Sequence, residues 1–345
     1  MDNRAVSSML YLHQIHVAVS SKDHKMHLER ILCTISFPYY CGGVILGGTS
    51  FLISFAILLF FEKSYQLIWV FLMLSALISL QSVGVIWARN KMRLFEDTLI
   101  NIVEWPKEDM KKLYGRQVAI IFDDKKMIIA GICAVIIAYV LGVDHFGFPF
   151  QGFPNIFFKI IFYFAIYTMG IGLYVMVMTA SAVHKIGSLP LTANVLFSKD
   201  IQAIGILYSE FTVYAASIYI TWVIFLILTP LELSSQERTI GFLIFATLLC
   251  TYFILPQHGI HAMMVRTKRE KTDIFSSQLR AVANDTFKDP NDVNVLSLTD
   301  LLDIQYRLDE MSEWPFSFYE ILHIALITII PLIVLSLELL PGAIK

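Results

Sequence analysis

Two histidines follow a proline at the end of a strongly apolar stretch, in the sequence FILPQHGIHAMM (253–264). His258 and His261 are three residues apart, which places both imidazoles on one side of a helix. Two imidazoles hold a metal ion only when further ligands converge on them, and these twelve residues contain no carboxylate or cysteine. Three interpretations stay open: hydrogen-bonded packing residues, a titratable element of an inner vestibule, and a metal site. Packing is typical of histidine at a membrane boundary, so we predict no metal and no cofactor.

A polar stripe runs along the apolar stretch 206–229. Glu210, Tyr214, Ser217 and Thr221 are spaced at i, i+4, i+7 and i+11, which brings them to one face of a helix. An ionisable residue at membrane depth is costly and usually faces a bundle interior or a water-filled cavity. The stripe fits two hypotheses, the lining of a cavity or pore and hydrogen bonding between helices.

A second row occupies the stretch 156–182 with the same spacing. Tyr163, Tyr167, Gly170 and Tyr174 again share one helical face, and tyrosines beside a close-approach glycine are typical of helix packing. If this row and the stripe headed by Glu210 face each other, they enclose an aromatic, mildly polar chamber of a kind that small ligands occupy.

The last apolar stretch, 317–340, carries the third group of polar residues. Ser317, Glu320 and Thr328 fall on one side of a helix, with His323 a further turn round, and Pro331 invites a kink in mid-span. Glu320 fits two hypotheses: a carboxylate at the inner mouth of a cation pathway, and a side chain that simply reaches the membrane interface.

The elements that position these residues are membrane-spanning helices. Hydrophobic residues make up 57% of the 345 residues and charged residues only 16%, whereas soluble domains carry about a quarter charged residues. A helix of about 20 apolar residues crosses a bilayer. Seven such stretches lie near 41–61, 66–88, 127–143, 156–182, 206–229, 239–256 and 317–340, the third being short enough to leave open whether it crosses fully.

The basic residues predict the orientation. Of the 26 Lys and Arg residues, 22 lie in the N-terminal segment and in the three loops that alternate with it across the membrane. Because Lys and Arg concentrate in cytoplasmic loops, we predict an inner N-terminus and an outer C-terminus. The net charge of −2 gives no indication of a nucleic-acid partner.

The sequence therefore predicts an all-α polytopic protein of the cell membrane in four regions. A cytoplasmic amphipathic segment (1–40) precedes the first six spans (41–256), whose inner loop 89–126 contains helical spacing up to a break at Trp105-Pro106. Residues 257–316 continue the sixth span as a helix, break at DPND and return as a cytoplasmic helical hairpin. Residues 317–345 form the last span and the outer C-terminus.

Three segments carry a resemblance to known proteins: LPLTANVLFSKDIQAIGIL (189–207), FILPQHGIHAMM (253–264) and MSEWPFSFYEIL (311–322). They look like recurring signatures of uncharacterised prokaryotic multi-pass membrane proteins, which implies no activity. In layout alone, seven spans with a cytoplasmic helical segment before the last one are similar to insect gustatory and odorant receptor channels. Those channels are tetramers whose last helix lines the pore.

From these features we expect a homo-oligomeric channel, with a tetramer favoured, that conducts cations and is opened by a small ligand. The alternative is a small-molecule carrier or membrane receptor that uses the chamber between spans four and five. The sequence contains no Walker A, GxGxxG, GxSxG or HExxH pattern and no convergent catalytic set, so we expect no enzyme.

Overall fold

The described part of the chain is all-helical in the computed structural model, with no strand among its residues. The helices are α3 (Tyr39–Phe61), α4 (Ile68–Ile102), α5 (Lys107–Ile121), α6 (Asp124–Val140), α7 (Phe153–Ile186), α8 (Asp200–Leu228) and α9 (Ser235–Lys288). The structure describes residues 39–61, 68–102, 106–141, 152–186, 200–229, 235–288, 302–303 and 305–306. The amphipathic segment, most of the return arm of the hairpin and the last span lie outside these ranges.

Within the described residues, four helices are long and apolar enough to cross a membrane. Their membrane-length segments are Cys41–Phe60, Ile68–Ile100, Phe153–Lys185 and Ile204–Ile227, which correspond to the predicted first, second, fourth and fifth spans. The predicted third span forms α6, whose 17 residues extend about 25 Å at 1.5 Å per residue. The protein is thus a helical membrane protein, and α6 is shorter than each of the four membrane-length helices.

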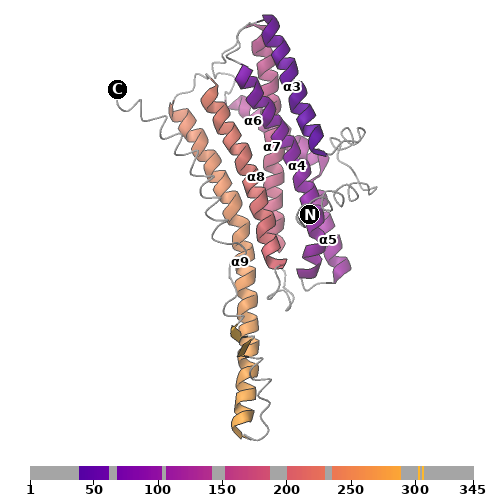
Figure 1. Cartoon of the computed structure of the whole chain (residues 1–345), viewed down its shortest axis with the longest axis vertical. Helices are drawn as coiled ribbons and strands as arrows, with labels where there is room; N and C mark the ends of the chain where they lie inside the picture. The colour runs from indigo at the N-terminus through magenta and orange to yellow at the C-terminus, as the bar shows by residue number, and fades with distance from the viewer. Residues whose placement is uncertain are drawn as a thin grey trace, which may run out of the picture.

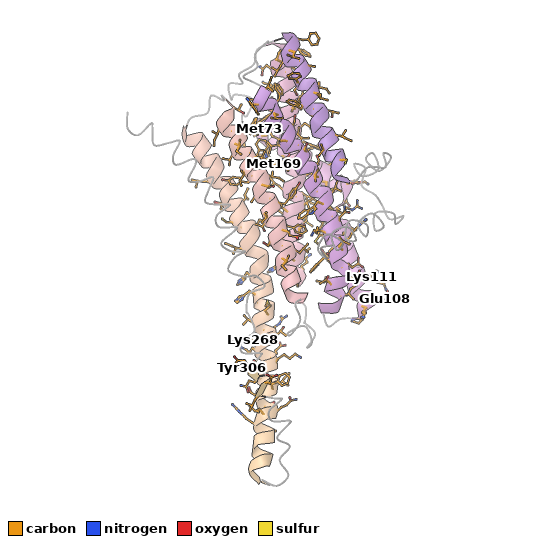
Figure 2. All side chains as sticks on the ribbon, viewed as in Figure 1. Met73, Glu108, Lys111, Met169, Lys268 and Tyr306 are labelled. Atoms are coloured by element: carbon orange, nitrogen blue, oxygen red, sulfur yellow. The ribbon has the colours of Figure 1, made fainter. Side chains whose placement is uncertain are left out.

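Helix α9 confirms that the sixth predicted span continues past its proline. Its 54 residues form one helix, about 80 Å long at 1.5 Å per residue. Figure 1 shows the consequence: α9 lies beside α8 in the bundle and then projects well beyond the other helices. Lys268 lies on this projecting part (Figure 2).

The predicted break is confirmed at Pro106, whose backbone ψ of 124° is not helical and which directly precedes the first residue of α5; Trp105 lies outside the described residues. Helix α5 places Met110, Tyr114, Val118 and Ile121 on its buried face. The Tyr114 hydroxyl donates to the Met92 carbonyl of α4 at 2.6 Å, and burial raises the pKa of Tyr114 well above its usual value. The hydroxyl therefore stays protonated, and its hydrogen bond attaches α5 to α4. We call the end of the bundle at which α5 lies the α5 end.

Small residues allow two pairs of helices to approach closely. A side chain at Gly43 or Gly47 of α3 would overlap α4 at Val83 and Ser79. A side chain at Gly131 of α6 would overlap Tyr167 of α7. Close backbone contact of this kind drives association between helices in membranes, where no hydrophobic effect operates between apolar faces.

Candidate ligand-binding cavity

A cavity lies between α4, α7, α8 and α9. Helix α4 packs against both α7 and α8, and α9 packs against the same two helices, so the four surround it. The cavity comprises about 860 Å³ of space free of atoms, including the part continuous with its surroundings. Its lining is aromatic and aliphatic, and the described lining residues carry no charge. Residues from all four helices contribute, among them Gln81, Trp87, Met169, Gly172, Met176, Thr179, Tyr214, Trp222, Leu248 and Tyr252; Met169 is labelled in Figure 2.

Aromatic rings close the end of the cavity that faces away from α5. The ring of Phe162 on α7 lies 6.2 Å from Trp222 and 5.9 Å from Phe225, both on α8. Trp222 and Phe225 also meet edge-on at 5.6 Å. Edge-to-face contacts are favourable arrangements of aromatic rings, so this cluster joins α7 to α8 just beyond the cavity.

Hydrogen bonds of the Gln81 side-chain amide connect three helices at the same end of the cavity. With its oxygen directed at the indole, the Gln81 side chain accepts from Trp222 Nε1 at 3.0 Å, while its nitrogen donates to the Ala165 carbonyl at 3.1 Å and to the Thr168 hydroxyl. This orientation is assigned from the partners, because the opposite one places oxygen against oxygen. Gln81 thereby links α4, α7 and α8 with every polar atom of the amide used, as burial in an apolar bundle demands.

Stacked rings form the cavity wall nearer the α5 end. Trp87 of α4 stacks on Tyr214 of α8 at 5.1 Å and 19°, and meets Phe211 edge-on at 5.3 Å. The absence of a side chain at Gly84 makes room for the Tyr214 ring. The Tyr214 hydroxyl donates to the Leu80 carbonyl at 2.7 Å. This hydrogen bond and the stacking on Trp87 together fix the position of the Tyr214 ring.

An ion pair lies one turn beyond this wall. Lys91 Nζ of α4 is 2.7 Å from Glu210 Oε2 of α8, and the same ammonium lies 5.9 Å from the centre of the Trp87 ring. Glu210, which heads the polar stripe, therefore pairs with the helix beside it and is not among the described residues that line the cavity. The pair is part-exposed, so its contribution to stability is small.

The proline of α9 is compensated by a tyrosine of α8. Pro256 lacks an N–H, so the carbonyl of Tyr252, four residues earlier, has no helical donor. The Tyr208 hydroxyl donates to that carbonyl at 2.7 Å, and the rings of Tyr208 and Tyr252 lie 5.2 Å apart. Both side chains are buried. The proline next to the histidine pair thus creates a docking point between α8 and α9 at the cavity wall.

The tyrosine row of α7 faces away from the cavity. Tyr167 fills the space left by Gly131 of α6, and the Tyr174 hydroxyl donates to the Ile120 carbonyl of α5 at 2.8 Å. Tyr163 packs with the apolar cluster that contains Phe162. The opposite face of α7, with Met169, Gly172, Met176 and Thr179, lines the cavity instead.

Of the residues in the predicted polar stripe of α8, Tyr214 lines the described cavity wall. The Ser217 hydroxyl donates to the Tyr214 carbonyl at 2.7 Å, and the Thr221 hydroxyl donates to the Ser217 carbonyl at 2.8 Å. Both bonds stay within α8, a common way for a helix in an apolar surrounding to satisfy hydroxyl groups.

The histidine pair lies beside a third histidine. Gly259, between His258 and His261, packs so closely on α7 that an added side chain would lie 2.9 Å from His184 Nδ1. His258 is exposed and His261 half-buried. Across the described residues there is no group of three His, Cys, Asp or Glu side chains with the geometry to hold a metal ion. The contact of Gly259 with α7 places the pair at a helix junction.

Sequence patterns miss most of the cavity. Gln81 offered a signal, since an amide inside an apolar stretch demands partners, whereas Thr179, Trp222 and Tyr252 follow no recognisable spacing. The predicted pore residues Ser317, Glu320, His323 and Thr328 lie outside the described residues, so the channel stays a prediction of the sequence. No family model, curated protein or solved structure matches this chain.

Proposed function

We propose that this protein binds a small, mostly apolar molecule in the cavity between α4, α7, α8 and α9, as a membrane receptor or carrier. The observation that carries the proposal is the cavity itself, bordered by four helices and lined by aromatic and aliphatic side chains with few polar groups. Ligand sites typically combine such a lining with a few polar groups that fix orientation.

The framework around the cavity supports binding over imperfect packing, because well-packed protein interiors contain few voids larger than a water molecule. The rings around it are held by directional contacts at both ends, through Gln81 and Trp222 on one side and Trp87 and Tyr214 on the other. These contacts therefore fix the surrounding side chains in positions that leave the space between the helices empty.

We further propose seven spans with an inner N-terminus and an outer C-terminus in the cell membrane. The described basic residues of α5 and of the projecting part of α9 support this orientation (Figure 1), because basic segments stay in the cytoplasm. The α5 end is then the cytoplasmic end. Labelling of single-cysteine variants at positions 112 and 280 with an impermeant maleimide tests the scheme, and labelling of these positions from outside intact cells contradicts it.

The binding proposal is tested with a small apolar photoprobe. Gly172 lines the cavity and has no atom within 4 Å of an added Cβ, so a side chain has room to begin there and Gly172→Leu occupies part of the cavity. Gly48 of α3 has the same open surroundings on an exposed face, which makes Gly48→Leu a matched control. The full-length protein in nanodiscs is irradiated with 3-trifluoromethyl-3-phenyldiazirine, and labelled peptides are identified by mass spectrometry.

We expect saturable labelling of α8 peptides that contain Ala215 and Tyr219, and we expect Gly172→Leu to abolish the saturable part. Gly48→Leu should leave it unchanged, because that position faces away from the cavity. Labelling that is not saturable, or that both substitutions reduce equally, contradicts a binding cavity. A thermal-shift screen of compounds against the wild type and Gly172→Leu then identifies ligands that act through this space.

A further inference from the structure

We infer that the ligand of this cavity is the hydrocarbon chain of a membrane lipid, which enters sideways from the bilayer beside Leu248 of α9. This inference rests on the proposed function and adds the class of the ligand and its route. Three observations lead to it: the exposure of Leu248, the depth at which that residue lies, and the absence of charge in the described lining.

Leu248 lines the cavity and is also exposed. The residue is 46% exposed, and it is the only exposed one among the described lining residues. Farther toward the α5 end, the same face of α9 is covered, since Tyr252 is 8% exposed and Gly259 packs on His184 of α7. A residue that lines a cavity and is exposed as well marks the place where the cavity meets its surroundings. The mouth of the cavity therefore lies at Leu248, one turn before the face of α9 is closed.

Leu248 lies at the depth of the lipid chains. The ring of Tyr252 lies 5.2 Å from that of Tyr208, which belongs to the membrane-length segment Ile204–Ile227 of α8. Helices α8 and α9 are consecutive and antiparallel (Figure 1), so the four residues from Tyr252 back to Leu248 lead about 6 Å farther along this segment, toward its middle. A molecule that reaches the mouth at this depth comes from the hydrocarbon core of the bilayer.

The lining suits a hydrocarbon chain. Gln81 and Trp222 bind each other, and the Tyr214 hydroxyl donates to the Leu80 carbonyl. The Thr179 oxygen has no hydrogen-bond partner, but it is buried and therefore out of reach of a ligand. The described lining carries no charge, so an ionised group inside the cavity would lack a counter-charge at considerable cost. A hydrocarbon chain needs no such partner, and the head group of the lipid stays outside.

A phospholipid with a diazirine in the middle of one acyl chain tests this inference. The full-length protein in nanodiscs that contain this lipid is irradiated, and labelled residues are identified by mass spectrometry. We expect labels on Ala215 and Tyr219 of α8, which line the cavity. We also expect labels on Ile206 and Ile224 of α8, which are exposed and lie outside the described lining. These two isoleucines report lipid contact without entry and serve as an internal control.

Two substitutions separate entry from contact at the outer surface. Gly172→Leu occupies part of the cavity, and Leu248→Trp places a larger side chain at its mouth. Each should remove most of the labelling of Ala215 and Tyr219, while the two exposed isoleucines keep theirs. Leu243→Trp is the matched control, because Leu243 is an exposed leucine of α9 outside the described lining. It should leave the labelling of all four residues unchanged.

The outcomes distinguish failure of the inference from failure of the cavity function. Equal labelling of Ala215 and Tyr219 in Leu248→Trp and the wild type overturns entry beside Leu248. Labelling of these residues by 3-trifluoromethyl-3-phenyldiazirine but not by the lipid overturns the inference and leaves the cavity function standing. A helix of this chain or of a second copy over Leu248 would give that result. Absence of labelling at both residues with either probe overturns the cavity function as well.

Discussion

Tyr208 compensates for the proline inside α9, and its removal should be costly only while the proline is present. The Tyr208 hydroxyl is 2.7 Å from the carbonyl of Tyr252. Pro256 has no N–H to offer that carbonyl, so Tyr208→Phe leaves a buried acceptor without a donor. In Pro256→Ala, the residue at 256 regains its N–H and can satisfy the same carbonyl within the helix.

The magnitude follows from the environment of this bond. Hydrogen bonds between membrane helices contribute about 0.6 kcal/mol on average and about 1.7 kcal/mol at most, and an unsatisfied buried acceptor costs about 1–3 kcal/mol. Phenylalanine retains the ring that lies 5.2 Å from Tyr252, so packing changes little. We expect Tyr208→Phe to lower the free energy of unfolding by about 1.5 kcal/mol.

A double-mutant cycle isolates the bond. In the Pro256→Ala background we expect Tyr208→Phe to cost at most about 0.5 kcal/mol, a coupling of about 1 kcal/mol. Tyr214→Phe is the matched control, since its hydroxyl also donates to a backbone carbonyl, that of Leu80. Leu80 retains a helical donor at Gly84, so its substitution should be cheaper and independent of Pro256.

The assay is reversible unfolding in mixed micelles with increasing dodecyl sulfate, followed by tryptophan fluorescence and circular dichroism. An equal cost of Tyr208→Phe in both backgrounds refutes the reasoning, because the value of the bond would then not depend on the missing N–H. A cost below that of Tyr214→Phe refutes it as well.

Three further predictions concern the bundle. Asp123→Ala removes the carboxylate that accepts from the first N–H groups of α6, so thermal unfolding should show a loss of about 1 kcal/mol. Gly47→Leu forces a side chain into the backbone of α4 and should cost about 3 kcal/mol in the same measurement, whereas Gly48→Leu should stay within about 0.5 kcal/mol. Glu210→Gln deprives Lys91 of its partner; we expect a loss of about 0.5 kcal/mol that high salt diminishes, and a salt-independent loss contradicts the ion pair.

Hydropathy alone determined that this chain forms membrane-length helices. The apolar stretches near 41–61, 66–88, 156–182 and 206–229 became helices able to cross a bilayer, because a backbone surrounded by lipid must satisfy its hydrogen bonds internally. The break at Pro106 and the continuation of the sixth span past its proline were likewise predictable. These are properties of one segment and its solvent.

Helical spacing also identified which residues share one face of a helix, but it did not identify which neighbouring helix that face contacts. Tyr167 and Tyr174 do lie on one side of α7, yet that side contacts α6 and α5. Glu210 heads a stripe as predicted, and its partner is Lys91, which lies 119 residues earlier in the chain. A period of 3.6 residues fixes directions around one axis, whereas the neighbour in each direction depends on how the helices assemble.

The cavity was decided by tertiary structure alone. It arises where four helices leave space between Met176 and Thr179 of α7 on one side and Tyr214 of α8 on the other. Its rim depends on contacts between residues distant in sequence, such as Gln81 with Trp222 and Tyr208 with Tyr252. The sequence does not predict which hydroxyl lacks a hydrogen-bond partner, because the partners of the Thr179 hydroxyl depend on the position of every group around it.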